Sequence, residues 1–226
     1  MGVKVKRNKK LIAELAAVAI FAFGLSAIVF SDSSFAAKTK STLTCAPTNA
    51  VAHNPMPVPT PDAKAAQVDR TFTLNTNCGQ IVFKAFGHKA PLTVIGMTVL
   101  AKSGYFDNSL CHRITTSGIY VLQCGDPTAS GNGGLPWGPP DENLPKGSTD
   151  NYPAGTVAMA NSGPNTNGSQ FFIVYKDTTL GANYSIWGVV TKGLDIVQKV
   201  AAAGVLGGGS DGKPKMTIAI TSVTVK

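Results

Sequence analysis

Residues 159–173 read Met-Ala-Asn-Ser-Gly-Pro-Asn-Thr-Asn-Gly-Ser-Gln-Phe-Phe-Ile, and this stretch decides the fold of the chain. Its middle, Gly163 to Gly168, combines glycine, proline and asparagine, which disfavour helices and favour turns. Its end, Gln170 to Tyr175, is apolar and aromatic, which is typical of a strand. The stretch therefore predicts a polar loop that leads directly into a strand. By composition alone, a long hairpin connection is the alternative.

Two further runs narrow the interpretation. Residues 111–114 read Cys-His-Arg-Ile, and residues 120–127 read Tyr-Val-Leu-Gln-Cys-Gly-Asp-Pro. With residues 159–172 they resemble the signature of the cyclophilin family of peptidyl-prolyl isomerases. That signature has a His-Arg-Ile strand, an aromatic-x-x-Gln-Gly-Gly-Asp strand and a loop and strand that read Met-Ala-Asn-Ala-Gly-Pro-Asn-Thr-Asn-Gly-Ser-Gln-Phe-Phe. Within that loop this chain differs only at Ser162. The resemblance covers about Thr71 to Lys226.

The domain reads as many short strands and two helices. One helix is predicted from Pro91 to the glycine at Gly104, and the other over 194–203. Strands are predicted at 70–74, 80–86, 110–115, 119–124, 157–159, 170–175, 186–190 and 216–225. Many short strands favour an antiparallel barrel. The resemblance implies a mainly β fold, a closed eight-stranded antiparallel β-barrel capped by two α-helices.

The reaction that the resemblance implies breaks no bond. Rotation about an X–Pro amide faces a barrier of about 18–20 kcal/mol from resonance, so a catalyst must bind the twisted amide more tightly than either planar form. The twisted prolyl nitrogen is the better hydrogen-bond acceptor. A fixed arginine, always charged and planar, therefore binds the twisted state preferentially. We expect no cofactor and no metal.

The resemblance also implies a role for each site residue. Arg113 is expected to be the catalytic donor, and Gln123 is expected to orient it. Phe172 is expected to form the floor of the proline pocket, and His112 to be structural because no proton is transferred. The substrate-binding set that the resemblance implies is Tyr120, Val121, Ala160, Asn161, Ser162, Gln170, Phe172, Leu180 and Tyr184.

The chain departs from the family pattern at several positions. Val121 stands where a methionine is usual, Cys124 replaces the first glycine after the glutamine, and Tyr184 stands where many members carry a histidine. The link over 115–119 is longer by two residues. A tryptophan common in eukaryotic members, where it helps to bind cyclosporin, is replaced near Thr179. We expect catalysis to survive these changes and inhibition by cyclosporin to be weak.

The N-terminal region resembles an export signal. Residues 1–10 are basic, residues 11–30 are apolar apart from Glu14 and Ser26, and small residues follow up to Ala37. A cleaved signal peptide and an uncleaved signal anchor both fit 1–37, since the apolar run is long enough to span a bilayer. Either kind of leader places the residues that follow it outside the cytoplasmic membrane. Residues 38–68 are predicted to be a Pro-rich linker, and 69–226 the isomerase domain.

Charge and cysteine content limit the other possibilities. The formal charge is +8, but the domain holds no Lys/Arg run, so nucleic-acid binding is not expected.

The cysteines lie at 45, 78, 111 and 124, without metal-site spacing. Four cysteines allow three connectivities. The family fold implied by the resemblance places Cys111 and Cys124 on neighbouring strands and favours that disulfide, with Cys45–Cys78 as the remainder; buried free thiols are the alternative.

Two functions remain in competition. The first is an exported, monomeric peptidyl-prolyl cis-trans isomerase that assists the folding of proline-containing clients and contacts the membrane if the leader is uncleaved. The second is a module of the same fold that binds proline segments without turnover. The presence of Arg113 and Gln123 favours the enzyme. A hydrolase is not expected, because the chain has only three histidines, which gives little material for a catalytic triad.

Overall fold

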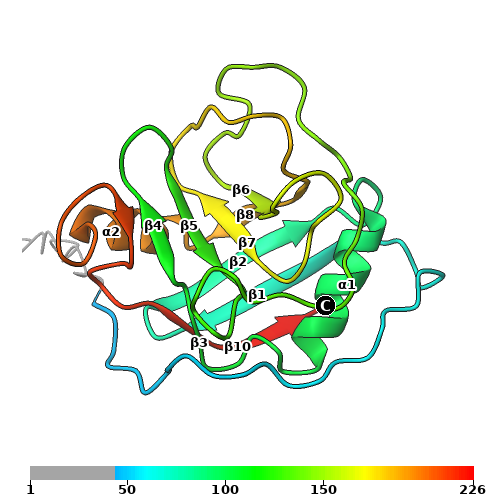
Figure 1. Ribbon diagram of the computed structural model, residues 1–226, viewed down its shortest axis with the longest axis horizontal. Helices are drawn as coiled ribbons and strands as arrows, with labels where there is room; N and C mark the ends of the chain where they lie inside the picture. The colour runs from blue at the N-terminus through cyan, green and yellow to red at the C-terminus, as the bar shows by residue number, and fades with distance from the viewer. Residues whose placement is uncertain (1–43) are drawn as a thin grey trace, which may run out of the picture. The chain divides into compact units, whose positions relative to one another are not determined.

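The computed structural model describes residues 44–226 (Figure 1). The predicted signal peptide or anchor at 1–37 lies outside the described residues, as does the start of the predicted linker. Within 44–226, no helix combines the length and the apolar character that crossing a membrane requires.

One antiparallel sheet is the framework of the described residues. Its ten strands are β1 (Arg70–Thr76), β2 (Gly79–Ala85), β3 (Ser109–Leu110), β4 (Arg113–Thr115), β5 (Val121–Cys124), β6 (Thr156–Met159), β7 (Phe171–Val174), β8 (Ile186–Lys192), β9 (Asp211–Gly212) and β10 (Ala219–Val225). Their order in the sheet is β3-β10-β1-β2-β8-β6-β7-β5-β4-β9. The fold is therefore mainly β, as predicted.

The strand predicted over 110–115 is split, because the chain changes partners there. The N–H of Cys111 still donates to the carbonyl of Ile218, 3.0 Å away, beside β10. Two residues later, Arg113 pairs with Gln123 on β5. The sheet curls so that β3 and β4, near its two ends, are separated in the chain by only two residues. The closure of eight strands into a barrel stays a prediction, since the ladder over residues 44–226 has ten strands and two ends.

Aromatic residues fill the main core. Phe72 and Phe83 stack with ring centroids 5.1 Å apart, and Trp187 meets both edge-on at 5.3 and 5.0 Å. All three rings are almost completely buried. Because side chains alternate along a strand, the residues between them face the other side of the sheet. The core therefore occupies one face and leaves the opposite face of the strands for other contacts.

Both predicted helices are present, α1 (Pro91–Lys102) and α2 (Leu194–Ala203), and they lie at opposite ends of the sheet (Figure 1). The N-cap of α1 is an alanine, which provides no side-chain acceptor. The carboxylate of Glu142 takes this role instead. It accepts hydrogen bonds from the N–H groups of Leu92 (3.1 Å) and Thr93 (2.8 Å). A negative charge at this helix end is also favourable for the helix dipole.

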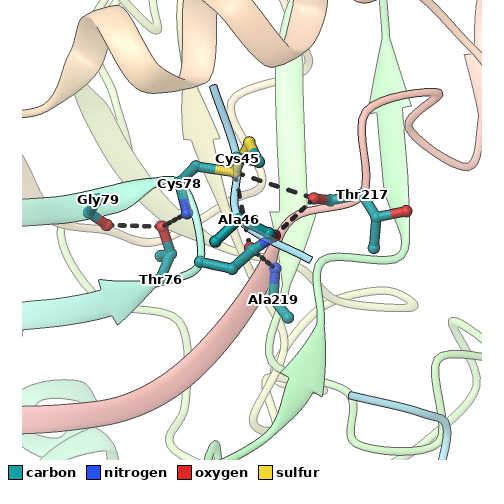
Figure 2. The surroundings of a disulfide bond; sticks show 8 residues. Cys45, Ala46, Thr76, Cys78, Gly79, Thr217 and Ala219 are labelled. Atoms are coloured by element: carbon teal, nitrogen blue, oxygen red, sulfur yellow. Dashed lines mark hydrogen bonds between the residues drawn. A yellow bond between two sulfur atoms is a disulfide. The ribbon is translucent and has the colours of Figure 1, made fainter. Parts of the chain in front are cut away.

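The described part of the predicted linker, residues 44–68, is extended and lies against the domain; we call it the strap. Its first anchor is the Cys45–Cys78 disulfide at the turn between β1 and β2 (Figure 2). Beside it, the N–H of Ala46 donates to the carbonyl of Asn77, and the Asn77 amide donates back to the carbonyl of Ala46, both at 2.8 Å. Disulfide and hydrogen bonds together fasten the start of the strap.

Further anchors hold the strap along its length. The N–H of His53 donates to the carbonyl of Pro127 at 2.9 Å. Val58 packs against the main core, and Pro61 lines a small hollow on α1 together with Trp137. The proline content explains why this segment is extended. Residues 44–68 are therefore fastened to the domain by a disulfide, hydrogen bonds and apolar contacts; the domain boundary at residue 69 stays a prediction.

Candidate functional site

A row of side chains crosses four strands on the face opposite the core. Arg113 on β4 stands opposite Gln123 on β5, which stands opposite Phe172 on β7, which stands opposite Ala158 on β6. Directly opposed residues in an antiparallel sheet project to the same side. The strand register thus places the predicted arginine, the predicted glutamine and the predicted phenylalanine next to one another.

Hydrogen bonds connect the polar members of the site. The Arg113 Nη1 donates to Gln123 Oε1 at 3.1 Å, and the Gln123 Nε2 donates to Gln170 Oε1 at 2.8 Å. The Nε2 of Gln170 in turn donates to the carbonyls of Gly131 and Gly133, both at 2.9 Å. Gln123 is therefore held from both sides, which fixes the orientation of the oxygen that Arg113 contacts.

Apolar side chains gather beside this network in a second cluster, separate from the main core. Its buried members are Val121, Tyr152, Ala158, Phe172 and Val174, and its partly buried members are Ile119, Ala160, Leu180, Tyr184 and Ile186. The ring of Tyr184 meets that of Phe172 edge-on at 5.6 Å. Of the predicted apolar site residues, the cluster brings together Val121, Ala160, Phe172, Leu180 and Tyr184.

Tyr120 is placed elsewhere, in contrast to its predicted position in the pocket. Its ring packs against Tyr175 at 5.9 Å, and the ammonium of Lys176 lies 4.3 Å from the ring centroid. Strand alternation explains the difference, because a residue next to Val121 projects to the opposite side. Ile119, which the sequence did not single out, lies in the apolar cluster instead.

The loops beside the row enclose a cavity of about 450 Å³. Ala160, Asn161, Ser162 and Gln170, all predicted to bind substrate, line it together with Gln123. Its opposite wall, residues 131–138, was not predicted as part of the site. The Asn161 amide donates to the carbonyl of Asn183 at 2.8 Å, so the cavity is tied to the segment that precedes Tyr184.

A buried carboxylate shapes the opposite wall. Asp126 accepts hydrogen bonds from the N–H groups of Thr128 (2.8 Å), Gly131 (2.8 Å) and Gly133 (3.1 Å). Burial favours protonation of Asp126, but the hydrogen bond from the Thr128 hydroxyl and those from these N–H groups outweigh it, and the pKa of the carboxyl lies below its usual value. The anionic carboxylate therefore holds the loop that receives the hydrogen bonds of Gln170.

Both disulfides favoured by the resemblance are formed, Cys45–Cys78 and Cys111–Cys124. The second joins the approaches to the row, since Cys111 comes two residues before Arg113 and Cys124 directly follows Gln123. The glycine after Cys124 is required by the structure. Gly125 has a φ of +90°, and a Cβ there would collide with the carbonyl oxygen of Ser169.

Two polar site residues have no signal in the sequence. Asp211 on β9 binds Arg113 through two hydrogen bonds of 2.7 Å, from Nε and from Nη2. This contact lowers the pKa of Asp211 and raises that of Arg113. The hydroxyl of Tyr152 accepts from the N–H of Tyr184 at 3.0 Å, and burial raises the pKa of Tyr152 to about 12. Their partners are distant in the chain, so no local motif marks either residue.

Within residues 44–226, no group of three or more His, Cys, Asp or Glu side chains is placed to hold a metal ion.

Comparison with known proteins places these features in a family. The family model described as cyclophilin type peptidyl-prolyl cis-trans isomerase/CLD matches residues 71–225. A "Probable peptidyl-prolyl cis-trans isomerase B" from Mycobacterium tuberculosis is 46% identical over 159 residues, which is 66% of this chain and 52% of the relative. Its Mycobacterium leprae counterpart is 41% identical, covering 67% and 55%. The chain thus spans about half the length of these relatives.

A plant relative and a solved structure are matched over nearly their whole length. "Peptidyl-prolyl cis-trans isomerase CYP18-1" from Arabidopsis thaliana is 37% identical, covering 68% of this chain and 94% of the relative. The crystal structure of a Cryptosporidium parvum cyclophilin type isomerase has a TM-score of 0.60 and 30% identity, covering 70% of this chain and 98% of that one. The fold, the site motifs and the family match agree, and the chain belongs to the cyclophilin-type peptidyl-prolyl cis-trans isomerase family.

Proposed function

We propose that this protein is a peptidyl-prolyl cis-trans isomerase that acts on proline-containing polypeptides. The observation that carries the proposal is the row in which Arg113, Gln123 and Phe172 follow one another across β4, β5 and β7. It sets a cationic hydrogen-bond donor beside an apolar surface that suits a proline ring. A related cyclophilin-type structure was determined in the presence of the dipeptide Ala-Pro, which supports this substrate class.

In the proposed mechanism, the proline ring packs on the apolar cluster against Phe172, Leu180 and Tyr184. Arg113 donates to the prolyl nitrogen as the amide twists, and the hydrogen bond strengthens as the nitrogen loses resonance. Each 1.36 kcal/mol by which this bond favours the twisted state accelerates the exchange tenfold. Asn161 binds the polypeptide backbone through its own backbone on one side of the bond while the other side rotates, and Gln170 closes the side wall of the cavity.

We also propose that the protein is exported, as a monomer, and assists the folding of exported clients. The basic and apolar pattern of residues 1–37 supports export. Two disulfides support an oxidising compartment, since such bonds are rare in the cytosol. A membrane contact through residues 11–30 follows if the leader is uncleaved. Fractionation of cells, with immunoblotting of the envelope and culture medium, tests the location; a purely cytosolic protein contradicts it.

The activity is tested by NMR exchange of a short peptide with one Ala-Pro bond in the presence of the full chain. We expect cis-trans exchange, which takes tens to hundreds of seconds without a catalyst, to become fast at catalytic protein concentrations. Binding of the peptide without acceleration identifies a proline-binding module instead. Neither binding nor acceleration overturns the proposal.

Replacing Tyr152 with phenylalanine is expected to weaken the pocket. The change leaves the N–H of Tyr184 without its partner at 3.0 Å, so the free energy of unfolding should fall by about 1–3 kcal/mol. Tyr184 is then held less firmly in the apolar cluster. Peptide affinity should fall by roughly three- to tenfold, which corresponds to about 1 kcal/mol. Urea denaturation and peptide titration measure the two effects.

Tyr175→Phe is the matched control. The Tyr175 hydroxyl also bonds to the backbone, as a donor to the carbonyl of Thr115 at 2.7 Å, but its ring lies outside the apolar cluster. We expect this variant to lose stability but keep its peptide affinity. If Tyr152→Phe behaves in the same way, Tyr152 has no role in positioning the pocket.

A further inference from the structure

We propose that Asp211 is a positioning residue that aims the guanidinium of Arg113 at the substrate. The proposal rests on the proposed isomerase function and adds to it a residue that lies outside all three family motifs. The observation behind it is the paired contact of the Asp211 carboxylate with Arg113, Oδ1 with Nε and Oδ2 with Nη2, both at 2.7 Å.

The backbone delivers Asp211 to this position. Strand β9 pairs with β4, so that Asp211 stands opposite Thr115. The N–H of Thr116 donates to the carbonyl of Ser210 at 2.8 Å and extends the pairing. The loop that carries β9 is closed at its base, where the N–H of Leu206 donates to the carbonyl of Lys213 at 2.8 Å. The carboxylate is therefore held by an ordered hairpin-like loop.

Counting donors shows what the contact does to Arg113. A guanidinium has five N–H donors in one plane. Asp211 occupies two of them and Gln123 occupies a third, through Nη1. Two N–H groups remain, one on each terminal nitrogen. Because a paired contact fixes the plane as well as the position of a guanidinium, it also fixes the direction of these two donors.

Exposure argues against a role in stability alone. The side chains of Arg113 and Asp211 are 38% and 52% exposed, and exposed ion pairs contribute little to stability. The contact that Arg113 makes with Gln123 involves a single hydrogen bond of 3.1 Å, which leaves the guanidinium plane free to turn. The carboxylate of Asp211 supplies the second constraint that a fixed donor needs.

The test compares Asp211→Asn and Asp211→Glu with the parent protein. Asparagine keeps the size but offers one acceptor and an NH₂ group that opposes Nη2, so the paired contact is lost. We expect kcat/KM for an Ala-Pro peptide to fall about tenfold, with peptide affinity changed less than twofold, because the contact acts on the twisted state. Glutamate keeps the charge and both acceptors and should recover part of the rate.

Two further measurements separate positioning from a structural effect. Asp69→Asn removes the 2.9 Å ion pair between Asp69, just before β1, and Lys84 on β2, which is partly exposed; this control should keep full activity. The NMR signal of the Arg113 Nε–H should be sharp and protected in the parent protein and should broaden in Asp211→Asn. This signal reports the loss of the Nε–H contact itself; the split between kcat/KM and peptide affinity is what separates positioning from a merely structural role.

The outcomes are distinct. If Asp211→Asn keeps kcat/KM within twofold of the parent while Arg113→Ala loses it, the positioning role is overturned and the proposed function stands. If Arg113→Ala also keeps its activity, the proposed mechanism itself fails. If Asp211→Asn loses peptide affinity in proportion to the rate, Asp211 contributes to ground-state binding and the positioning role is again overturned.

Discussion

Replacement of Arg113 by alanine is expected to lower kcat/KM by about 10²- to 10³-fold, the usual cost of removing a pre-oriented donor to a transition state. The fold should survive, because the side chain of Arg113 is 38% exposed and its ion-pair partner 52% exposed. The remaining groups, Gln123 and Asp211, can then be solvated by water. NMR exchange of an Ala-Pro peptide measures the rate, and near-ultraviolet circular dichroism checks the fold.

The conservative change Arg113→Lys tests whether the positive charge alone is sufficient for the rate. Lysine keeps the positive charge but loses the planar fork that Asp211 binds at two points. We expect kcat/KM of Arg113→Lys to lie closer to that of Arg113→Ala than to that of the parent protein. Lys84→Ala, which removes a cation from a different ion pair, serves as the control and should retain full activity. An active Arg113→Ala protein would show that the apolar cluster alone accelerates the exchange.

The second large effect is a loss of stability, which we expect when Cys45 and Cys78 are both replaced by serine. Their disulfide spans 33 residues of sequence, and the chain-entropy model assigns a loop of that size about 4 kcal/mol of unfolding free energy. The Cys111–Cys124 disulfide spans only 13 residues, for which the same model gives about 3 kcal/mol. We therefore expect loss of the strap disulfide to lower the urea midpoint of unfolding more than loss of the Cys111–Cys124 disulfide does.

A surface variant of the strap controls for changes in the segment itself. Val51 is 65% exposed, and Val51→Ser should change the free energy of unfolding by less than about 0.5 kcal/mol. The double serine variant should also expose the strap to protease, because its remaining anchors are hydrogen bonds and the contacts of Val58 and Pro61. An unchanged urea midpoint would mean that these contacts hold the strap without the disulfide.

Local patterns predicted the elements well where short-range physics sets them. The helix from Pro91 and the helix over 194–203 both follow from apolar spacing and from proline and glycine at their ends. The pattern was less reliable where a strand changes partners. The run 110–115 was predicted as one strand, yet it divides at residues 111–112 because one half pairs with β10 and the other with β5.

The site shows the same division. The motifs located Arg113, Gln123 and Phe172, and the structure places them in one row. Tyr120 was assigned to the pocket from its place in a motif, but strand alternation turns its ring toward Tyr175. A motif records which residues occur together; it does not record on which side of a strand each one projects.

Residue identity and short-range spacing were enough to predict the family, the β-rich character and the chemistry of the arginine. The cap that Glu142 gives α1, the contact of Asp211 with Arg113 and the attachment of the strap to the domain became visible in the folded chain alone. The Glu142 and Asp211 contacts join residues 49 and 98 positions apart. Contacts over such separations exist only after the sheet has brought distant segments together, so no local pattern of residues encodes them.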